Sequence, residues 1–360
     1  MATMRERAEA GLAWTVVRLP QPLARLVAGR PIRVDGQELD VQVQIALRLE
    51  KLIGGFKPRP VSEARALRRS EARAFSGPRI ELARVEAMEV PGPAGPIRAR
   101  RYVPHGVQDP APLVVYFHGG GHVVGDLDTH DQSCRFLARE TPATLIAIEY
   151  RCAPDDRFPA AVDDALAAFR WAHANAAQLG VDPDRIAVAG DSAGGNLAAA
   201  VAQLAAADGG PAPAFQALIY PVCDYSRKRR SYELFAEGFF LTSAEMDWYR
   251  DHYFASADDR SDPRASPILG EDLSGVPPAH IVTAGFDPLR DEAEDYAARL
   301  RDAGVPVTLR RESDLVHGFI NAVGLGGRSA DAGRTIAAEI AAGLTAGARD
   351  HSLGLSTAPG

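Results

Sequence analysis

Residues 186–202 constrain the fold more than any other part of the sequence. This segment begins with a short apolar run, passes through a Gly-Asp-Ser-Ala-Gly turn centred on Ser192, and ends in an alanine-rich stretch. The order predicts a buried strand, a sharp turn and a helix, because small residues on both sides of the serine let the two backbones pass closely. Glycine and serine are common in loops, so the position between a strand and a helix makes the signal strong. The turn also places the Ser192 hydroxyl at a helix N-terminus, which favours a developing negative charge.

Apolar runs and helical patterns alternate along the rest of the chain. Continuous apolar runs occupy residues 113–117, 144–148, 217–220 and 280–284, as expected of strands that are buried on both faces. Helical patterns lie between or after them, at 131–140, 160–175, 290–302 and 330–344. Two further strands are expected on either side of a Pro/Gly turn, at 80–90 and 97–103, and a last strand at 307–311. The rhythm predicts an α/β fold with a mostly parallel central sheet and helices on both faces.

Two parts of the chain do not follow this rhythm. Residues 1–75 have a helical pattern, and residues 225–260 are rich in aromatic and charged side chains. We expect the second segment to be a helical insertion that joins the N-terminal helices over the top of the sheet. An amphipathic helix docked on a membrane is one interpretation of the N-terminal part, but the mixed charges of its polar face favour packing onto the protein itself. Residues 349–360 are expected to be a flexible tail.

Composition excludes several classes of partner and site. A formal net charge of −7 disfavours nucleic acid or an anionic membrane as the main partner. Cys134, Cys152 and Cys223 are odd in number and scattered, which fits free thiols in a reducing compartment. The sequence shows no signal-peptide pattern and no apolar run long enough to span a bilayer. A cytoplasmic location is therefore the default expectation.

The order of three residue types predicts a catalytic triad. Serine needs a base to remove its proton, and that base needs an orienting acid; in doubly wound hydrolases the chain order is serine, acid, histidine, each at the end of a strand. His317 is the histidine after Ser192 that follows a predicted strand in a loop, with glycine behind it. Asp287 leaves the end of the preceding strand, although it could also only cap the next helix. Asp291 and Glu292 are rivals that fall inside that helix.

A glycine-rich segment follows the strand at 113–117. His118 is followed by Gly119, Gly120 and Gly121, and three glycines present backbone amides without obstruction. Together with the Ala193 amide, the amides of Gly120 and Gly121 would form an oxyanion hole, in which the loss of one donor typically costs about 10²–10³-fold in rate.

The histidines and aspartates between positions 118 and 131 are dense in potential metal ligands, but a glycine turn separates His118 from His122. We therefore predict no metal site.

Motifs along the chain resemble those of a known family. Five motifs are similar to those of the hormone-sensitive-lipase-like (bacterial family IV) esterases of the α/β-hydrolase superfamily: His-Gly-Gly-Gly from His118, Glu-Tyr-Arg-Cys-Ala-Pro from Glu149, Gly-Asp-Ser-Ala-Gly-Gly from Gly190, Asp-Pro-Leu-Arg-Asp-Glu from Asp287 and His-Gly-Phe from His317. The resemblance covers about residues 80–345. It implies an α/β-hydrolase fold, a Ser192–Asp287–His317 triad, a Gly120, Gly121 and Ala193 oxyanion hole, and no cofactor. It also implies a helical cap from residues 1–75 and 225–262 over a catalytic domain of residues 76–224 and 263–348.

The resemblance also suggests roles around the triad. Glu149, His118, Gly119 and Asp191 would support the site. His122, where the family more often has an aromatic residue, would line the substrate pocket with Phe239 and Phe240.

The function expected from these features is hydrolysis of small-molecule esters with short- to medium-chain acyl groups. Two alternatives stay open: a catalytically silent small-ligand receptor on the same fold, which the presence of His317 disfavours, and a hydrolase of amides, lactones or acetylated sugars. The last strand, near Val307 and Arg311, is an expected sheet edge through which a homodimer could form.

Overall fold

The computed structural model describes residues 15, 18–53 and 57–354. Its centre is an eight-stranded sheet with the order β10-β9-β8-β7-β5-β6-β4-β3, and a separate two-stranded hairpin, β1 with β2, lies in the N-terminal part. The bounds of the strands are Arg33–Val34 (β1), Gln37–Glu38 (β2), Arg84–Gly92 (β3), Gly95–Val103 (β4), Ala111–Phe117 (β5), Thr144–Ile148 (β6), Val181–Asp191 (β7), Phe215–Ile219 (β8), Ala279–Phe286 (β9) and Val307–Val316 (β10).

The six strands β5, β6, β7, β8, β9 and β10 run parallel to one another. Strands β3 and β4 are antiparallel and lie at one edge of the sheet. Parallel strands place their carboxyl ends at the same edge of the sheet. The register pairs Phe117 with Gly190 and Val316 with Phe286. The residues that follow β5, β7, β9 and β10 therefore emerge beside one another, and this edge carries the candidate site.

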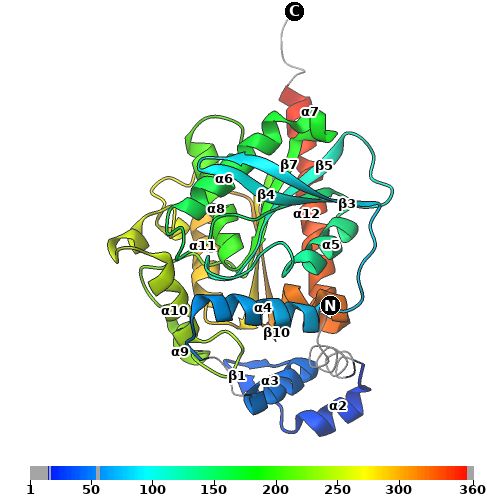
Figure 1. The fold of residues 1–360 in the computed structure, drawn as a ribbon, viewed down its shortest axis with the longest axis vertical. Helices are drawn as coiled ribbons and strands as arrows, with labels where there is room; N and C mark the ends of the chain where they lie inside the picture. The colour runs from blue at the N-terminus through cyan, green and yellow to red at the C-terminus, as the bar shows by residue number, and fades with distance from the viewer. Residues whose placement is uncertain (1–14, 16–17, 54–56, 355–360) are drawn as a thin grey trace, which may run out of the picture.

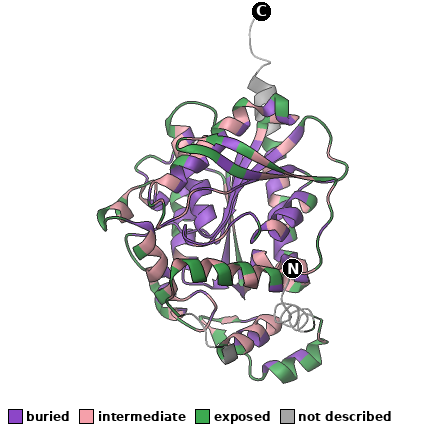
Figure 2. Cartoon of the chain, in the orientation of Figure 1, coloured by how far each residue is buried: buried purple, intermediate pink, exposed green. Residues whose placement is uncertain are grey.

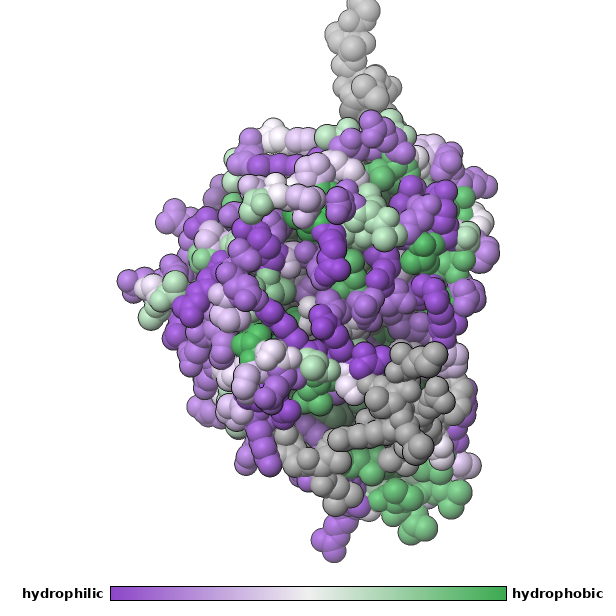
Figure 3. Space-filling model, in the orientation of Figure 1, coloured by the Kyte–Doolittle hydropathy of each residue, from purple (hydrophilic) through white to green (hydrophobic). Residues whose placement is uncertain are grey.

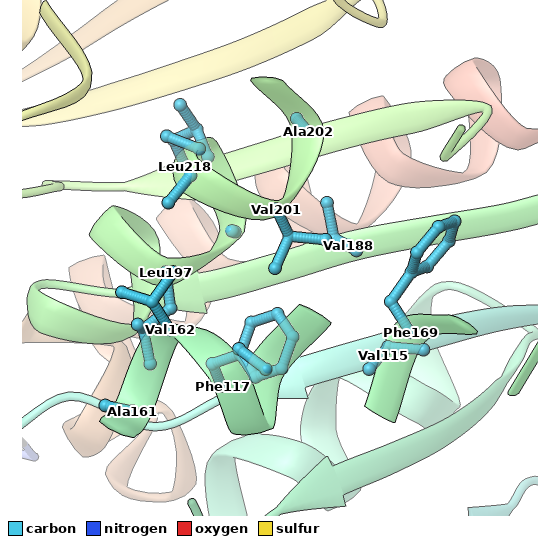
Figure 4. Packing of buried hydrophobic residues seen from close by; sticks show 14 of the residues in the cluster. Val115, Phe117, Ala161, Val162, Phe169, Val188, Leu197, Val201, Ala202 and Leu218 are labelled. Carbon is cyan, nitrogen blue, oxygen red and sulfur yellow. The ribbon is translucent and has the colours of Figure 1, made fainter. Parts of the chain in front are cut away.

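Helices cover both faces of the sheet (Figure 1). On one face pack α6 (Ala160–Ala174), α8 (Ala193–Ala207) and α11 (Arg290–Asp302), and on the other α5 (Asp131–Glu140) and α12 (Gly327–Gly354). Alanines dominate α8, which lets its backbone approach β7 closely. Figure 4 shows Val201 of α8 and Phe169 of α6 lying over Val115 and Val188 of the central strands. A large apolar core results, and it fixes the strand ends rigidly.

The N-terminal segment and the insertion both lie at the carboxyl end of the sheet (Figure 1). The first contains α2 (Gln21–Ala28), α3 (Val41–Ile53) and α4 (Val61–Phe75), and the second contains α9 (Arg230–Leu234) and α10 (Ser243–Tyr253). Apolar packing joins them to the sheet. In one cluster, Leu47 of α3 packs with Phe235 and Phe239 of the insertion and with Phe286 at the end of β9; other residues of the insertion belong to the main core of the sheet. That the two segments act as a two-part cap, with the bounds given above, stays a prediction.

The α/β architecture predicted from the sequence is confirmed, with local differences at the ends of elements. Strand β3 begins at Arg84, where a start near residue 80 was predicted. Strand β10 continues to Val316, through an irregularity after Glu312, where an end near Arg311 was predicted. Strand β7 begins at Val181, before the predicted apolar run. Helix α12 continues to Gly354, where an end near Leu344 and a flexible tail from residue 349 were predicted; the rest of that tail, residues 355–360, lies outside the described residues. The added part of β7 is mostly polar, and the added part of β10 begins with three polar residues before Leu315 and Val316, so neither extension has a continuous apolar pattern.

Candidate active site

The three residues predicted as a triad lie within hydrogen-bond distance of one another. His317 Nε2 is 2.9 Å from Ser192 Oγ, and His317 Nδ1 is 2.7 Å from Asp287 Oδ2. Ser192 directly follows β7, Asp287 follows β9 and His317 follows β10. The Asp287 side chain is fully buried, while Ser192 is 8% exposed. A buried carboxylate, an imidazole and a slightly exposed hydroxyl in this order match the arrangement needed to activate a serine.

The turn at Ser192 has the strained geometry expected of it. Ser192 has φ 56° and ψ −118°, a backbone conformation that residues other than glycine rarely adopt. The flanking glycines are required by space: a Cβ on Gly190 would lie 2.3 Å from the Gly194 backbone, and a Cβ on Gly194 would lie 1.9 Å from the Phe117 carbonyl oxygen. The close approach of β5, β7 and α8 thus depends on glycine at both positions, as the sequence indicated.

Asp287 has both of the roles that its sequence position allowed. Its Oδ1 accepts a hydrogen bond from the Leu289 amide at 2.8 Å, which caps the turn before α11, and its Oδ2 contacts His317. The rivals point elsewhere: Asp291 accepts from the Ser231 amide, and Glu292 accepts from the Cys223 amide. The position at the end of β9, not the residue type, therefore selects Asp287.

The glycine loop after β5 is held from beneath by Asp191. The Asp191 carboxylate accepts hydrogen bonds from the Gly119 amide (2.9 Å) and the Tyr116 hydroxyl (2.8 Å), and its Oδ1 lies 3.4 Å from His130 Nε2. Burial alone would raise the pKa of Asp191, but His130 and these donors hold it well below its usual range. The Gly119 amide is therefore bonded to the Asp191 carboxylate. The next two residues, Gly120 and Gly121, both have positive φ angles.

A sequence model of a family described by its α/β-hydrolase fold matches residues 114–321. The chain is also 47% identical, over 87% of its own length and 85% of the relative's, to a protein of Mycobacterium tuberculosis named carboxylic ester hydrolase LipN. The chain belongs to the hormone-sensitive-lipase-like esterases of the α/β-hydrolase superfamily.

Solved structures agree with this esterase assignment. An ester hydrolase from the metagenome of Lake Arreo, solved with a phosphonate derivative, superposes with a TM-score of 0.81 at 40% identity and covers 84% of this chain and 98% of its own. A hyperthermophilic esterase of Pyrobaculum calidifontis gives a TM-score of 0.80 at 39% identity, with coverage of 84% and 98%. A protein of Pseudomonas putida named ethyl acetate hydrolase is 45% identical over 58% of this chain and 65% of its own length.

The residues predicted to support the site lie in two places. His118 is buried beneath the glycine loop, where its ring stacks on Tyr150 at 4.3 Å and its Nδ1 donates to the Gly119 carbonyl. Burial, followed by the neighbouring His130, lowers the pKa of His118 to about 4. Glu149 instead pairs with Arg98 of β4 and lines a separate cleft of about 320 Å³. Its supporting role in this esterase stays a prediction.

The side chains predicted to line the substrate pocket are largely packed in the structure. His122 is fully buried and stacks on Tyr253 at 4.0 Å, and burial, then His118, lowers its pKa to about 3. Phe239 lies in the cluster that joins the cap to the sheet, and the partly buried Phe240 packs against that cluster. A pocket role for these three residues stays a prediction.

Several side chains at the site were not foreseen. The Tyr249 ring lies so close to Gly121 that a Cβ there would be 2.2 Å from it, and the Tyr249 hydroxyl donates to Glu245 at 2.9 Å. On the far side of the glycine loop, Arg65 of α4 donates to the Val123 and Ala153 carbonyls, each at 2.9 Å, and to Asp155. No pattern in the sequence distinguishes Tyr249 and Arg65 from aromatic and arginine residues at ordinary surface positions.

Within the described residues, no group of three or more His, Cys, Asp or Glu side chains is arranged to hold a metal ion. Over the same residues, no helix is long and apolar enough to cross a membrane.

Glu292 is expected to make the stability of this esterase depend on pH. Burial raises the pKa of Glu292 to about 8, although the Cys223 amide and Arg229 oppose the shift. Because the folded-state pKa exceeds the unfolded value of about 4.3, this group's contribution to stability is full below pH 4.3 and is lost as the pH rises towards 8. From pH 5 to pH 8, we expect the unfolding free energy of the wild type to fall by on the order of 3 kcal/mol relative to that of Glu292→Gln.

Urea titrations of both proteins across this range, with Glu294→Gln as a control on the same helix, measure the difference. A constant difference between the wild type and Glu292→Gln would show that Glu292 is ionised in the folded state throughout.

Proposed function

We propose that this carboxylic-ester hydrolase is a serine carboxylesterase that acts through an acyl-enzyme intermediate. The observation that carries the proposal is the unbroken chain of contacts from Ser192 through His317 to Asp287, at 2.9 and 2.7 Å. Each member follows the end of a strand in a rigid sheet, so the geometry is fixed before any substrate binds. Preorganised groups of this kind supply a large part of enzymatic rate enhancement.

In the first half-reaction, Ser192 Oγ forms a bond to the ester carbonyl carbon while its proton moves to His317 Nε2. The tetrahedral intermediate then collapses, the carbon–oxygen bond to the alcohol breaks, and His317 returns the proton to the leaving alcohol. In the second half-reaction, a water oxygen forms a bond to the acyl carbon while a proton of that water moves to His317 Nε2. The bond from the acyl carbon to Ser192 Oγ then breaks, His317 returns the proton to Oγ, and the acid is released. Asp287 orients the imidazole and stabilises its positive charge in both halves.

The negative charge on the carbonyl oxygen would be held by the amides of Gly120, Gly121 and Ala193. Ala193 is the first residue of α8, whose N-terminal amides have no intrahelical acceptors. The Asp191 contacts to Gly119 and Tyr116 support this role, because they fix the loop that bears the two glycines.

The expected substrates are esters with short- to medium-chain acyl groups. The relative named ethyl acetate hydrolase supports a small acyl group, and the aromatic residues of the cap suggest an apolar one. Initial rates on p-nitrophenyl esters from acetate to palmitate should therefore peak at the short end. A maximum at palmitate would contradict the proposed chain-length preference.

The nucleophile can be tested independently of chain length. Diethyl p-nitrophenyl phosphate should label the protein once, release one equivalent of nitrophenol, and modify the tryptic peptide that contains Ser192. Labelling at any other residue would contradict the proposed nucleophile.

The alternatives are separable by the same assays. A catalytically silent receptor would neither react with the phosphate triester nor turn over any ester. A panel with p-nitrophenyl butyrate, an anilide, a lactone and an acetylated sugar ranks the other leaving groups, because the triad serves all of them and the cap selects among them.

A homodimer through β10 also stays a proposal. This strand is an edge of the sheet and pairs with β9 on one side, and edge strands are commonly covered or paired. A monomer mass by light scattering at micromolar concentration would exclude this dimer. The cytoplasmic location likewise stays a prediction from the sequence.

A further inference from the structure

The outer face of α2 exposes large apolar side chains. Among the described residues, five large hydrophobic side chains are exposed, and three of them, Leu23, Leu26 and Val27, belong to this eight-residue helix. Leu26 is 80% exposed. Figure 3 shows the corresponding apolar surface at the lower right of the molecule, over the position that α2 has in Figure 1. Figure 2 shows the same helix as largely exposed.

The packing of α2 is the reverse of that of an ordinary surface helix. Such a helix turns its large apolar residues towards the core and its polar residues towards water. Here the small residues Ala24 and Ala28 are buried against Ile45 of α3, while the leucines point outward. Contiguous exposed apolar surface of this kind typically marks an interaction site.

The helix is firmly held in this orientation. Gln44 of α3 is buried, and its amide group donates to the carbonyls of Ala28 (2.7 Å) and Arg30 (2.8 Å) at the end of α2. The Gln44 carbonyl oxygen also accepts from the Ile32 amide at 3.0 Å. The apolar face is therefore a fixed feature of the cap and does not depend on a loosely attached helix.

The N-terminal segment as a whole mixes both signs of charge, but the part of it around this face carries only positive charge. Residues 10–34 contain four arginines and no aspartate or glutamate, in a protein with 47 acidic residues and a net charge of −7. Arg25 and Arg30 flank the apolar face and are exposed, and Arg48 of α3 contacts the Val27 carbonyl at 3.0 Å. Within the described part of the chain, these three arginines form no ion pair.

We propose that α2 docks this esterase on the surface of an anionic lipid bilayer. An apolar helix face bordered by arginines fits the boundary between acyl chains and negatively charged headgroups. The complementary charge favours this partner over a second copy of the chain, because two such faces would bring like charges together. The whole-chain charge opposes approach to an anionic surface, but salt screens distant charges more than those in contact.

Docking in this way has a geometric consequence for the enzyme. Helix α2 lies at the outer end of the cap, on the same side of the molecule as the carboxyl ends of the strands (Figure 1). A bilayer bound there would face the end of the molecule that holds Ser192. Esters dissolved in the bilayer would then lie close to the cap.

Co-sedimentation with vesicles tests the proposal without relying on catalysis. With vesicles of equal parts phosphatidylcholine and phosphatidylglycerol at about 0.15 M salt, the wild type should bind at least about tenfold more strongly than with phosphatidylcholine alone. The double variants Leu23→Ser/Leu26→Ser and Arg25→Glu/Arg30→Glu should both lose this binding. The matched control Leu67→Ser/Phe75→Ser removes the two exposed apolar side chains of α4 and should bind as the wild type does.

Thermal melting by circular dichroism checks that each variant folds. Absence of wild-type binding, or equal binding to both kinds of vesicle, would overturn the proposal. It would also be overturned if light scattering showed an oligomer that Leu23→Ser/Leu26→Ser converts to a monomer, since the face would then join copies of the chain. Ester hydrolysis enters none of these outcomes, so the proposal can fail while the proposed function stands.

Discussion

Replacing Ser192 with alanine is expected to lower kcat for p-nitrophenyl butyrate by about 10⁶-fold, the scale of nucleophile removal in a serine hydrolase. Without Oγ there is no group for His317 Nε2 to deprotonate at 2.9 Å, and no acyl-enzyme can form. Alanine lacks only this oxygen, so the turn at φ 56° should persist and the melting temperature should change little.

The matched control is Ser274→Ala, in an exposed loop, whose kcat should equal that of the wild type. Retention of more than a tenth of the wild-type kcat in Ser192→Ala would mean that another residue is the nucleophile. It would also leave the Ser192–His317 contact without a catalytic role.

The second large effect is expected for Asp287→Asn, with a loss of about 10⁴-fold in kcat. The asparagine oxygen can still accept from the Leu289 amide, so the turn before α11 should remain intact. Its NH₂ group would then face His317 Nδ1 and stabilise the tautomer whose proton is on Nε2. That tautomer cannot accept the serine proton.

Asp291→Asn is the matched control, because Asp291 is four residues further on and binds the Ser231 amide. We expect a change of less than about threefold in kcat, since the Asp291 carboxylate accepts from the Ser231 amide and is not the carboxylate that contacts His317. Steady-state kinetics of the two variants at the same pH make the comparison. A larger loss in Asp291→Asn than in Asp287→Asn would reverse the assignment of the acid.

Much of this arrangement could be predicted because it depends on local patterns. The buried central strands have continuous apolar sequences, and parallel topology then brings the residues that follow them to one edge. Ser192, Asp287 and His317 could be selected from their positions relative to those strands. Gly190 and Gly194 leave no room for a Cβ atom, and a sequence shows such a requirement directly as glycine.

The features that could not be predicted depend on contacts between distant segments. Tyr116 and His130 meet Asp191 only after β5, α5 and β7 have assembled, and none of them has a pattern that marks it. Glu292 looks like an ordinary helix residue, yet it is buried and binds the amides of Cys223 and Asp224. The second half of β10 mixes polar residues with the buried Leu315 and Val316, so it shows neither an alternating nor a continuous apolar pattern. The exposed apolar face of α2 could not be predicted either, because the sequence of residues 1–75 showed only a helical pattern.

The contacts of Arg65 and Arg69 divide the cap into parts of different mechanical character. Arg65 holds α4 to the backbone on the far side of the glycine loop, and Arg69 pairs with Asp126 at 2.5 Å at the end of that loop. Helix α4 and the loop therefore form one rigid unit, and lifting this helix would disturb the amides that receive the oxyanion. Helix α10 touches the same loop through the Tyr249 ring. If the approach to Ser192 widens while the catalytic geometry stays intact, we expect the insertion to move and α4 to stay in place.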